Sequence, residues 1–525
     1  MSKQSDFKGR IPRRTFFVRL GGLAASSLII PALDLKGALA AGPPALAAAA
    51  AGRPRVTPKG APPAGLDVAG LKKTCAEAVA ALEKRFPYAT ALYTRDEELT
   101  ITVDRAGVSV DTTGPREGVV LSVYDGLGFR EEAGAFITAE GIGKLRDRLL
   151  QTPAVGAGVA SPDPGPALDK SWIEVGQTAV DSVSLAERVE RARALHAELL
   201  KRQPNLMNAR ITLSTGVGER VFVNRARRLH QRLGRAGYTA FVLAPAAGGG
   251  RPGSYSARHR GVGGLELCAM PEAEIQRLLE RAGRLAGAGA APAGERVVIT
   301  EPGLTGTLAH ESFGHGVEVD LFVQGRARAA QYLGKPVGSS LVRIYDDPTQ
   351  AGANGFYWFD DEGMSAASTT IVDQGIFKGG LTDALSAWRL KMPRTPNGRR
   401  ESSGRKAYAR MSSTFFGKGT STPAELIAGV KDGLLVGALR AGIEDPKGWG
   451  IQVVAQYGEE IKDGRLTGKV YSPVTLSGYV PDVLGSVDGV GNDFELTPGT
   501  CGKGYKELVP VSTGGPHLRF KARVS

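Results

Sequence analysis

Two of the chain's six histidines, His310 and His315, lie five positions apart, and Glu311 directly follows the first. Imidazole is a common zinc ligand, and a carboxylate beside a zinc-bound water can take its proton. In the more familiar H-E-x-x-H pattern the two histidines are four apart on one helix face. A spacing of five turns the second ring about 140° away from the first on a regular helix. The pattern therefore predicts a helix that ends or unwinds between them, which Gly314 and Gly316 permit.

The flanking sequence predicts a rigid support for this motif. Residues 296–300 have the pattern of a strand, Pro302-Gly303 that of a turn, and a helix is expected from Thr305 onward. Glu318 and Asp320 follow the motif, where they can accept the second N–H of each imidazole. The alternative is a helix end with two hydrogen-bonded histidines and solvated acids.

Cys501 has surroundings that a metal thiolate would need. It lies in the run Gly499-Thr500-Cys501-Gly502-Lys503-Gly504, in which glycines allow close backbone approach to an exposed sulfur. A catalytic zinc takes three protein ligands and a water. The sequence alone does not pair Cys501 with histidines nearly two hundred residues away. The other cysteines, Cys75 and Cys268, are too widely spaced for a disulfide framework, although one pair of the three could bridge.

Composition indicates a globular protein of about two to four domains. The chain has 525 residues, of which 42% are hydrophobic and 23% charged. The formal net charge is +13, of which the first 40 residues carry +5 (seven Lys or Arg against two Asp), leaving +8. No basic run is interleaved with aromatic residues, so no nucleic-acid partner is expected.

Residues 1–40 have the pattern of an export signal. Arg13-Arg14 precede Phe16, an apolar run covers residues 20–33, and Ala38-Leu39-Ala40 resembles a cleavage site. Paired arginines before an aromatic residue resemble the twin-arginine translocation signal. A general secretory signal or an uncleaved anchor is the alternative. The mature chain is expected to be periplasmic or secreted in a bacterium, and no later apolar run is long enough to span a membrane.

The rest of the chain predicts an α+β fold in two parts. An Ala/Pro/Gly-rich linker covers residues 41–65, and residues 66–288 form a mixed domain of helices and strands. Residues 244–264, which contain His259, are expected to be a mobile loop or hinge. Residues 289–525 are rich in strands and hold the histidine motif.

Several motifs of this second part resemble the TldD/PmbA family, also called modulators of DNA gyrase. The matching stretches run in order from about residue 289 to 517, and a looser match covers the first domain. The family usually has Glu-Gly-Asp where this chain has Glu318-Val319-Asp320, and the export signal is a further difference. The stretches that carry the resemblance are the histidine motif with residues 318–320, Asp360-Asp361-Glu362-Gly363, Asn397-Gly398-Arg399-Arg400-Glu401 and Gly499-Thr500-Cys501-Gly502-Lys503.

The resemblance implies a strand-rich metallopeptidase domain with one zinc ion per active subunit. It implies His310, His315 and Cys501 as ligands and Glu311 as the general base. Iron and cobalt accept the same ligands. Glu318, Asp320, Arg399 and Arg400 are candidates for a supporting or substrate-binding role. Family members that keep both histidines are the active subunits and cut unfolded peptides. They pair with a PmbA/TldE-like partner, so a homodimer or such a heterodimer is expected.

Two other functions remain open from the residues alone. The chain could be a catalytically silent subunit that holds peptides for a partner, although the intact histidine motif argues against it. It could also hydrolyse an ester or another non-peptide bond with the same groups.

Overall fold

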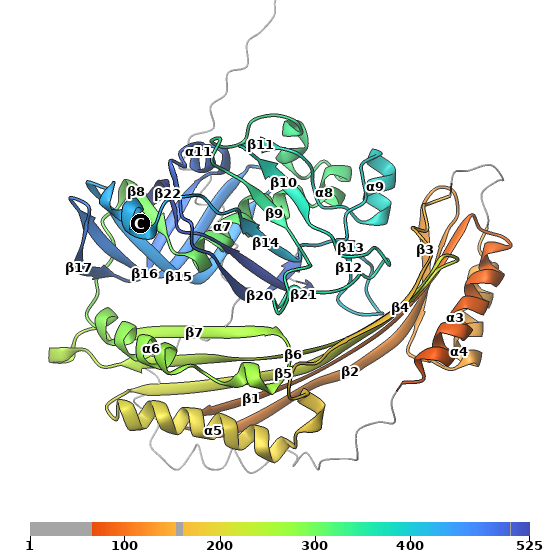
Figure 1. Ribbon diagram of the computed structural model, residues 1–525, viewed down its shortest axis with the longest axis horizontal. Helices are drawn as coiled ribbons and strands as arrows, with labels where there is room; N and C mark the ends of the chain where they lie inside the picture. The colour runs from red at the N-terminus through yellow and green to blue at the C-terminus, as the bar shows by residue number, and fades with distance from the viewer. Residues whose placement is uncertain (1–65, 154–160, 504–505) are drawn as a thin grey trace, which may run out of the picture. The chain divides into compact units, whose positions relative to one another are not determined.

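The computed structural model describes residues 66–153, 161–503 and 506–525, whose helices and strands give the α+β architecture expected (Figure 1). The predicted export signal and linker lie outside these residues. In the described part of the chain, no helix combines the length and the apolar character needed to cross a bilayer.

The first sheet is built from seven long, mostly antiparallel strands in the order β3-β2-β1-β5-β6-β4, with β7 paired to β6. A tight turn joins β5 to β6, in which the Asn224 side chain accepts hydrogen bonds from the N–H groups of Ala226 and Arg227. The strands are β1 (Tyr88–Asp104), β2 (Gly107–Tyr124), β3 (Phe129–Gly134), β4 (Leu168–Glu174), β5 (Asn208–Val223), β6 (Arg227–Ala244) and β7 (Gly253–Val262).

Four amphipathic helices cover this sheet (Figure 1). Helices α3 (Val68–Glu83) and α4 (Ala139–Leu150) share one hydrophobic cluster with β1, β2 and β5. Helices α5 (Leu185–Arg202) and α6 (Glu272–Leu285) share another with β1, β5, β6 and β7. Cys75 and Cys268 are buried in these two separate clusters as free thiols.

The predicted loop at residues 244–264 is wrong over most of its length. Residues Gly253–Val262 form β7, which pairs with β6 over ten residues. Exposed His259 lies opposite Tyr238 in that ladder. Strand β7 is half-exposed, so it is rich in arginine, serine and glycine and has few apolar residues. The alternation of apolar and polar residues that identifies a strand is therefore not visible in its sequence.

Strands after residue 293 form a second group. Five strands, β15-β8-β22-β18-β16, close into a ring because β15 also pairs with β16. The predicted boundary at residue 288 fits this division and stays a prediction. The strands of this sheet are β8 (Gly294–Thr300), β15 (Asp432–Asp445), β16 (Gly450–Lys462), β17 (Arg465–Tyr471), β18 (Val474–Tyr479), β19 (Gly489–Val490) and β22 (Leu518–Val524).

A further sheet, in the order β11-β10-β9-β14-β21-β20, carries the predicted cysteine ligand on β20. Helix α7 (Pro302–Phe313) lies against β15 of the ring and β21 of this sheet and is buried along most of its length. The strands are β9 (Ile344–Asp346), β10 (Thr369–Asp373), β11 (Ile376–Phe377), β14 (Ser413–Phe416), β20 (Glu495–Lys503) and β21 (Lys506–Gly515), with the separate pair β12 (Gly398–Arg399) and β13 (Tyr408–Ala409). The smaller helices are α8 (Val319–Val323), α9 (Ala384–Leu390), α10 (Pro423–Ala428) and α11 (Val480–Gly485).

Candidate metal centre

Helix α7 follows β8 directly, as the sequence predicted, and a glycine allows it to lie almost on top of β21. Pro302 occupies the first turn, where its missing N–H costs nothing. At Gly306, a Cβ would lie 2.0 Å from the backbone nitrogen of Gly514 on β21. No side chain fits there. This contact holds the helix that carries His310 against the strand paired with β20, which carries Cys501.

The helix ends between the two histidines. Helix α7 stops at Phe313, Gly314 has φ −100° and ψ −79°, and His315 begins a short 3₁₀ turn, η4 (His315–Val317). The 140° offset of a regular helix is removed by this break, and the two imidazole rings lie edge to face with centroids 5.1 Å apart.

Cys501 completes a group of three potential ligands. One ligand atom from each of His310, His315 and Cys501 lies within 4.8 Å of the others. The Sγ atom of Cys501 is 3.1 Å from Nε2 of His315. Two imidazoles and a thiolate match the donor set of a catalytic zinc site. The structure therefore brings together the three residues that the resemblance implied, and their role as ligands stays a prediction.

The electrostatics of this group also fit a cation. Burial alone would raise the pKa of Cys501, but His315, His310 and Arg410 outweigh it and hold that pKa well below its usual range. A thiolate is the form that binds metal. The buried Nδ1 atom of His310 has no hydrogen-bond partner among the described residues. A buried imidazole nitrogen of this kind needs a hydrogen-bond partner or a metal ion to satisfy it.

Glu318 contacts His315 on the side away from Cys501. It is fully buried, and its Oε2 lies 3.1 Å from Nδ1 of His315, which leaves Nε2 directed at the sulfur of Cys501. Lys503 Nζ lies 3.1 Å from the same carboxylate and Arg410 Nε lies 3.2 Å from it. Burial works against the charge of Glu318, and these cations hold its pKa well below the usual range.

Asp320 acts on this network through Lys503 rather than through an imidazole. Its carboxylate accepts from Lys503 Nζ at 2.7 and 2.8 Å. Burial raises its pKa to about 6, against the effect of that lysine. Asp320 therefore positions Lys503 beside Glu318.

Glu311 is one of the few residues of α7 with an accessible side chain. Its carboxylate faces β15, where a Cβ at Gly442 would lie 3.0 Å from Glu311 Oε1. Burial raises the pKa of Glu311, although His310 and His315 act in the opposite direction. A carboxylate with a raised pKa is a stronger proton acceptor near neutral pH.

The structure does not place Arg399 or Arg400 on the ligand group. Arg399 donates to the carbonyls of Met411 and Pro510, and Pro510 pairs with Thr500 across the β20–β21 hairpin. Arg399 therefore braces the hairpin that carries Cys501. Arg400 bonds to Glu131 on β3. A substrate-binding role for the two arginines stays a prediction.

Residues 293–525 match the model of the PmbA/TldA metallopeptidase C-terminal domain. The C-terminal half of the chain belongs to the TldD/PmbA family. Curated relatives are similar to about half of the chain. A metalloprotease from Methanothermobacter thermautotrophicus is 37% identical over 263 residues, which cover 50% of this chain and 57% of the relative. A metalloprotease TldD homolog from Haemophilus influenzae is 32% identical over 233 residues, which cover 44% and 48%. The chain thus spans about half the length of the curated relatives that it matches.

Solved structures of the TldD/PmbA type extend the likeness in fold to nearly the whole chain. A protein from Thermotoga maritima described as a modulator of DNA gyrase has a TM-score of 0.68 at 17% identity, covering 87% of this chain and all of that one. TldE from Thermococcus kodakarensis has a TM-score of 0.64 at 16% identity, covering 85% and 98%. At such low identity these likenesses concern the fold alone.

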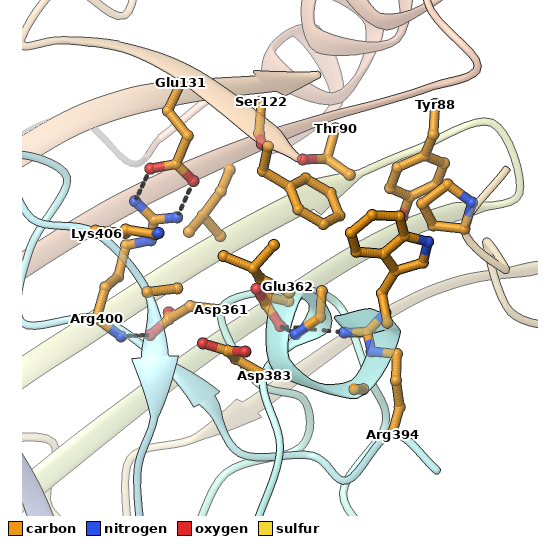
Figure 2. Close-up of a pocket in the computed structure, with 18 of the residues that line it drawn as sticks. Tyr88, Thr90, Ser122, Glu131, Asp361, Glu362, Asp383, Arg394, Arg400 and Lys406 are labelled. Atoms are coloured by element: carbon orange, nitrogen blue, oxygen red, sulfur yellow. Dashed lines mark hydrogen bonds and ion pairs between the residues drawn. The ribbon is translucent and has the colours of Figure 1, made fainter. Parts of the chain in front are cut away.

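Two further family motifs meet at a cavity of about 300 Å³ away from the ligand group (Figure 2). Asp361 and Glu362 come from one motif and Arg400 from the other. Figure 2 shows the Arg400 side chain paired with Glu131, and the two charged groups are 2.8 Å apart. The backbone N–H of Arg400 donates a hydrogen bond to the Asp361 carboxylate, also at 2.8 Å. The cavity walls come from β1–β3 of the first sheet and from α9 with its following loop. These motifs of the TldD/PmbA-type domain thus join the two parts of the chain.

Three site residues were missed by sequence reasoning. Arg410 is fully buried and donates to both Glu318 and Cys501 Sγ, the latter at 3.1 Å. Glu444 and Trp449 lie beside the turn that carries His315. None of the three lies in a motif of recognisable spacing. A lone arginine, glutamate or tryptophan in a strand-rich stretch gives no signal that could have identified it.

Proposed function

We propose that this chain is a zinc-dependent metallopeptidase that hydrolyses peptide bonds in extended or unfolded peptides. The convergence of His310, His315 and Cys501 beside Glu311 is the observation that carries this proposal. The printed names of the relatives, which include a zinc metalloprotease TldD homolog from Saccharolobus solfataricus, support it.

His310, His315 and Cys501 would hold the metal ion, and buried neighbours prepare two of them for it. Glu318 keeps the proton of His315 on Nδ1, so that Nε2 is free to bind, and His315, His310 and Arg410 together favour the thiolate form of Cys501. When bound, a zinc ion lowers the pKa of a coordinated water and polarises the scissile carbonyl. Iron or cobalt accept the same ligands.

Glu311 carries the proton in the reaction. Its carboxylate accepts a proton from the water as the water oxygen forms a bond to the carbonyl carbon. It then gives this proton to the amide nitrogen, and the C–N bond breaks to release the amine. Its raised pKa suits both steps. The peptide would lie extended, as a strand added beside the site, because that mode reads backbone groups and accepts varied side chains.

The partner and the location are also part of the proposal. The likeness in fold to TldE supports an assembly with a TldE-like partner or with a second copy of this chain. The twin-arginine pattern at Arg13-Arg14 supports export to the periplasm or beyond.

Glu311→Gln tests the proposal. We expect the variant to keep its metal and to lose cleavage of casein and of unfolded peptides, because an amide cannot accept the proton. Glu190→Gln, a surface glutamate on α5 whose side chain is 70% exposed, is the matched control and should keep full activity. Full peptidase activity in Glu311→Gln would contradict the assignment. Activity only on esters in a substrate screen would reassign the bond that is cut.

A further inference from the structure

Gly316, the residue after His315, leaves room for a small molecule between two buried side chains. A Cβ at this position would lie 3.5 Å from Oε2 and 3.8 Å from Oε1 of Glu444, and 3.5 Å from Nε1 of Trp449. Three polar atoms thus surround one point beside the turn that carries His315. A side chain at residue 316 would fill that point.

These three atoms are buried, and none has a hydrogen-bond partner within residues 66–153, 161–503 and 506–525. Each buried polar group without a hydrogen-bond partner costs about 1–3 kcal/mol of stability, so a bound molecule that satisfies these atoms is expected. Trp449 is fully buried, and its ring packs on Phe313 at the end of α7 with centroids 5.6 Å apart. It also holds a φ of +61° in the β15–β16 turn, which is costly for a bulky residue.

The chemistry of the surrounding atoms selects the ligand. The indole N–H of Trp449 only donates a hydrogen bond, and a carboxyl oxygen of Glu444 accepts one in either charge state. A cation would be repelled by the indole N–H. A water molecule accepts from the first and donates to the second, and a water needs two to four such partners. Because the atoms are buried, a substrate group does not reach them.

We propose that Gly316, Glu444 and Trp449 form a binding site for one internal water molecule, and that Glu444 is a positioning residue of the metal centre. Glu444 and Gly442 lie on the same face of β15, and Gly442 is the residue that Glu311 contacts. The water would link Glu444 to Trp449, whose ring packs on Phe313 at the end of α7, and would so hold β15 beside Glu311 and the turn that carries His315. The catalytic part of this inference rests on the proposed peptidase function.

Three variants test the site. Gly316→Ala places a methyl group where the water would bind, Glu444→Leu removes the acceptor, and Glu444→Gln keeps a hydrogen-bonding group of the same shape. Gly283→Ala is the matched control, because a Cβ there meets nothing within 4 Å. Each protein is loaded with cobalt, and its visible spectrum, metal content, kcat and KM for an unfolded peptide are measured beside a high-resolution crystal structure.

We expect the wild-type crystal to show the water and the Gly316→Ala crystal to lack it. Gly316→Ala and Glu444→Leu should shift the cobalt spectrum and lower kcat about tenfold with KM unchanged, and Glu444→Gln should restore both. Wild-type density in which Trp449 donates directly to a rotated Glu444 would overturn the water site. Wild-type spectra and kcat in Glu444→Leu would overturn the positioning role. If no variant or wild-type protein cuts peptides, the crystal and spectral results still decide the site, and only the proposed function fails.

Discussion

The Sγ atom of Cys501 lies 3.1 Å from Nε2 of His315, although 186 residues separate them in the chain. Two buried backbone contacts bring them together. Gly306 lets α7 lie against β21, and β21 pairs with the strand that carries Cys501. The geometry of the metal centre therefore depends on residues that never touch the metal.

Arg410→Met should weaken metal binding. The guanidinium donates to both Cys501 and Glu318, and its loss leaves the thiolate without its donor and the carboxylate without one of its cations. We expect zinc affinity to fall about 10- to 100-fold in competition with a chromophoric chelator. The exposed Arg440, changed to methionine, is the control. An unchanged zinc affinity in Arg410→Met would show that this arginine has no part in holding the metal.

The sequence and the resemblance named the three residues that the structure brings together, but not all of the residues that support them. Histidine spacing and flanking glycines were enough to predict that the helix ends before His315, because local geometry decides that. The resemblance supplied Cys501, which a single sequence cannot place, since its position depends on the packing of a distant sheet. Arg410 belongs to no motif, and only the fold brings it to Glu318. Strand β7 was missed for a different reason, because a half-exposed strand rich in arginine and glycine has no clear alternation.

Gly306→Ala should disturb both the fold and the metal centre. An added methyl group would meet the backbone of β21, which cannot move aside as a flexible side chain can. We expect the free energy of unfolding to fall by about 3 kcal/mol in urea denaturation, with a lower zinc affinity. Gly143→Ala on α4 places its Cβ 3.7 Å from the flexible Arg146 side chain, an ordinary contact, and should be neutral or slightly stabilising. Equal behaviour of the two variants would mean that α7 does not depend on this close approach.

Glu362→Gln should change how stability depends on pH. Burial raises the pKa of Glu362 to about 8, with Asp383 and Asp360 adding to it and Arg394 opposing it. An unfolded glutamate titrates near pH 4.3. Between these values the folded state holds a proton that the unfolded state has lost, so the free energy of unfolding falls as pH rises, by up to about 1.4 kcal/mol per pH unit.

The glutamine variant carries no titrating group at this position, so its stability should decline less between pH 4.5 and 8. Urea denaturation at a series of pH values, at constant metal content, measures the difference. Glu190→Gln should reproduce the wild-type profile, since that glutamate is exposed on α5. Parallel profiles for wild type and Glu362→Gln would show that Glu362 is ionised in the folded protein.

Elemental analysis of the purified chain beside its Cys501→Ser variant is the most direct test of the central claim, that His310, His315 and Cys501 bind one metal ion. We predict about one equivalent of zinc in the wild-type protein and a small fraction of that in the variant, since a serine hydroxyl is a much poorer zinc ligand than a thiolate. Equal zinc in the two folded proteins would contradict the account.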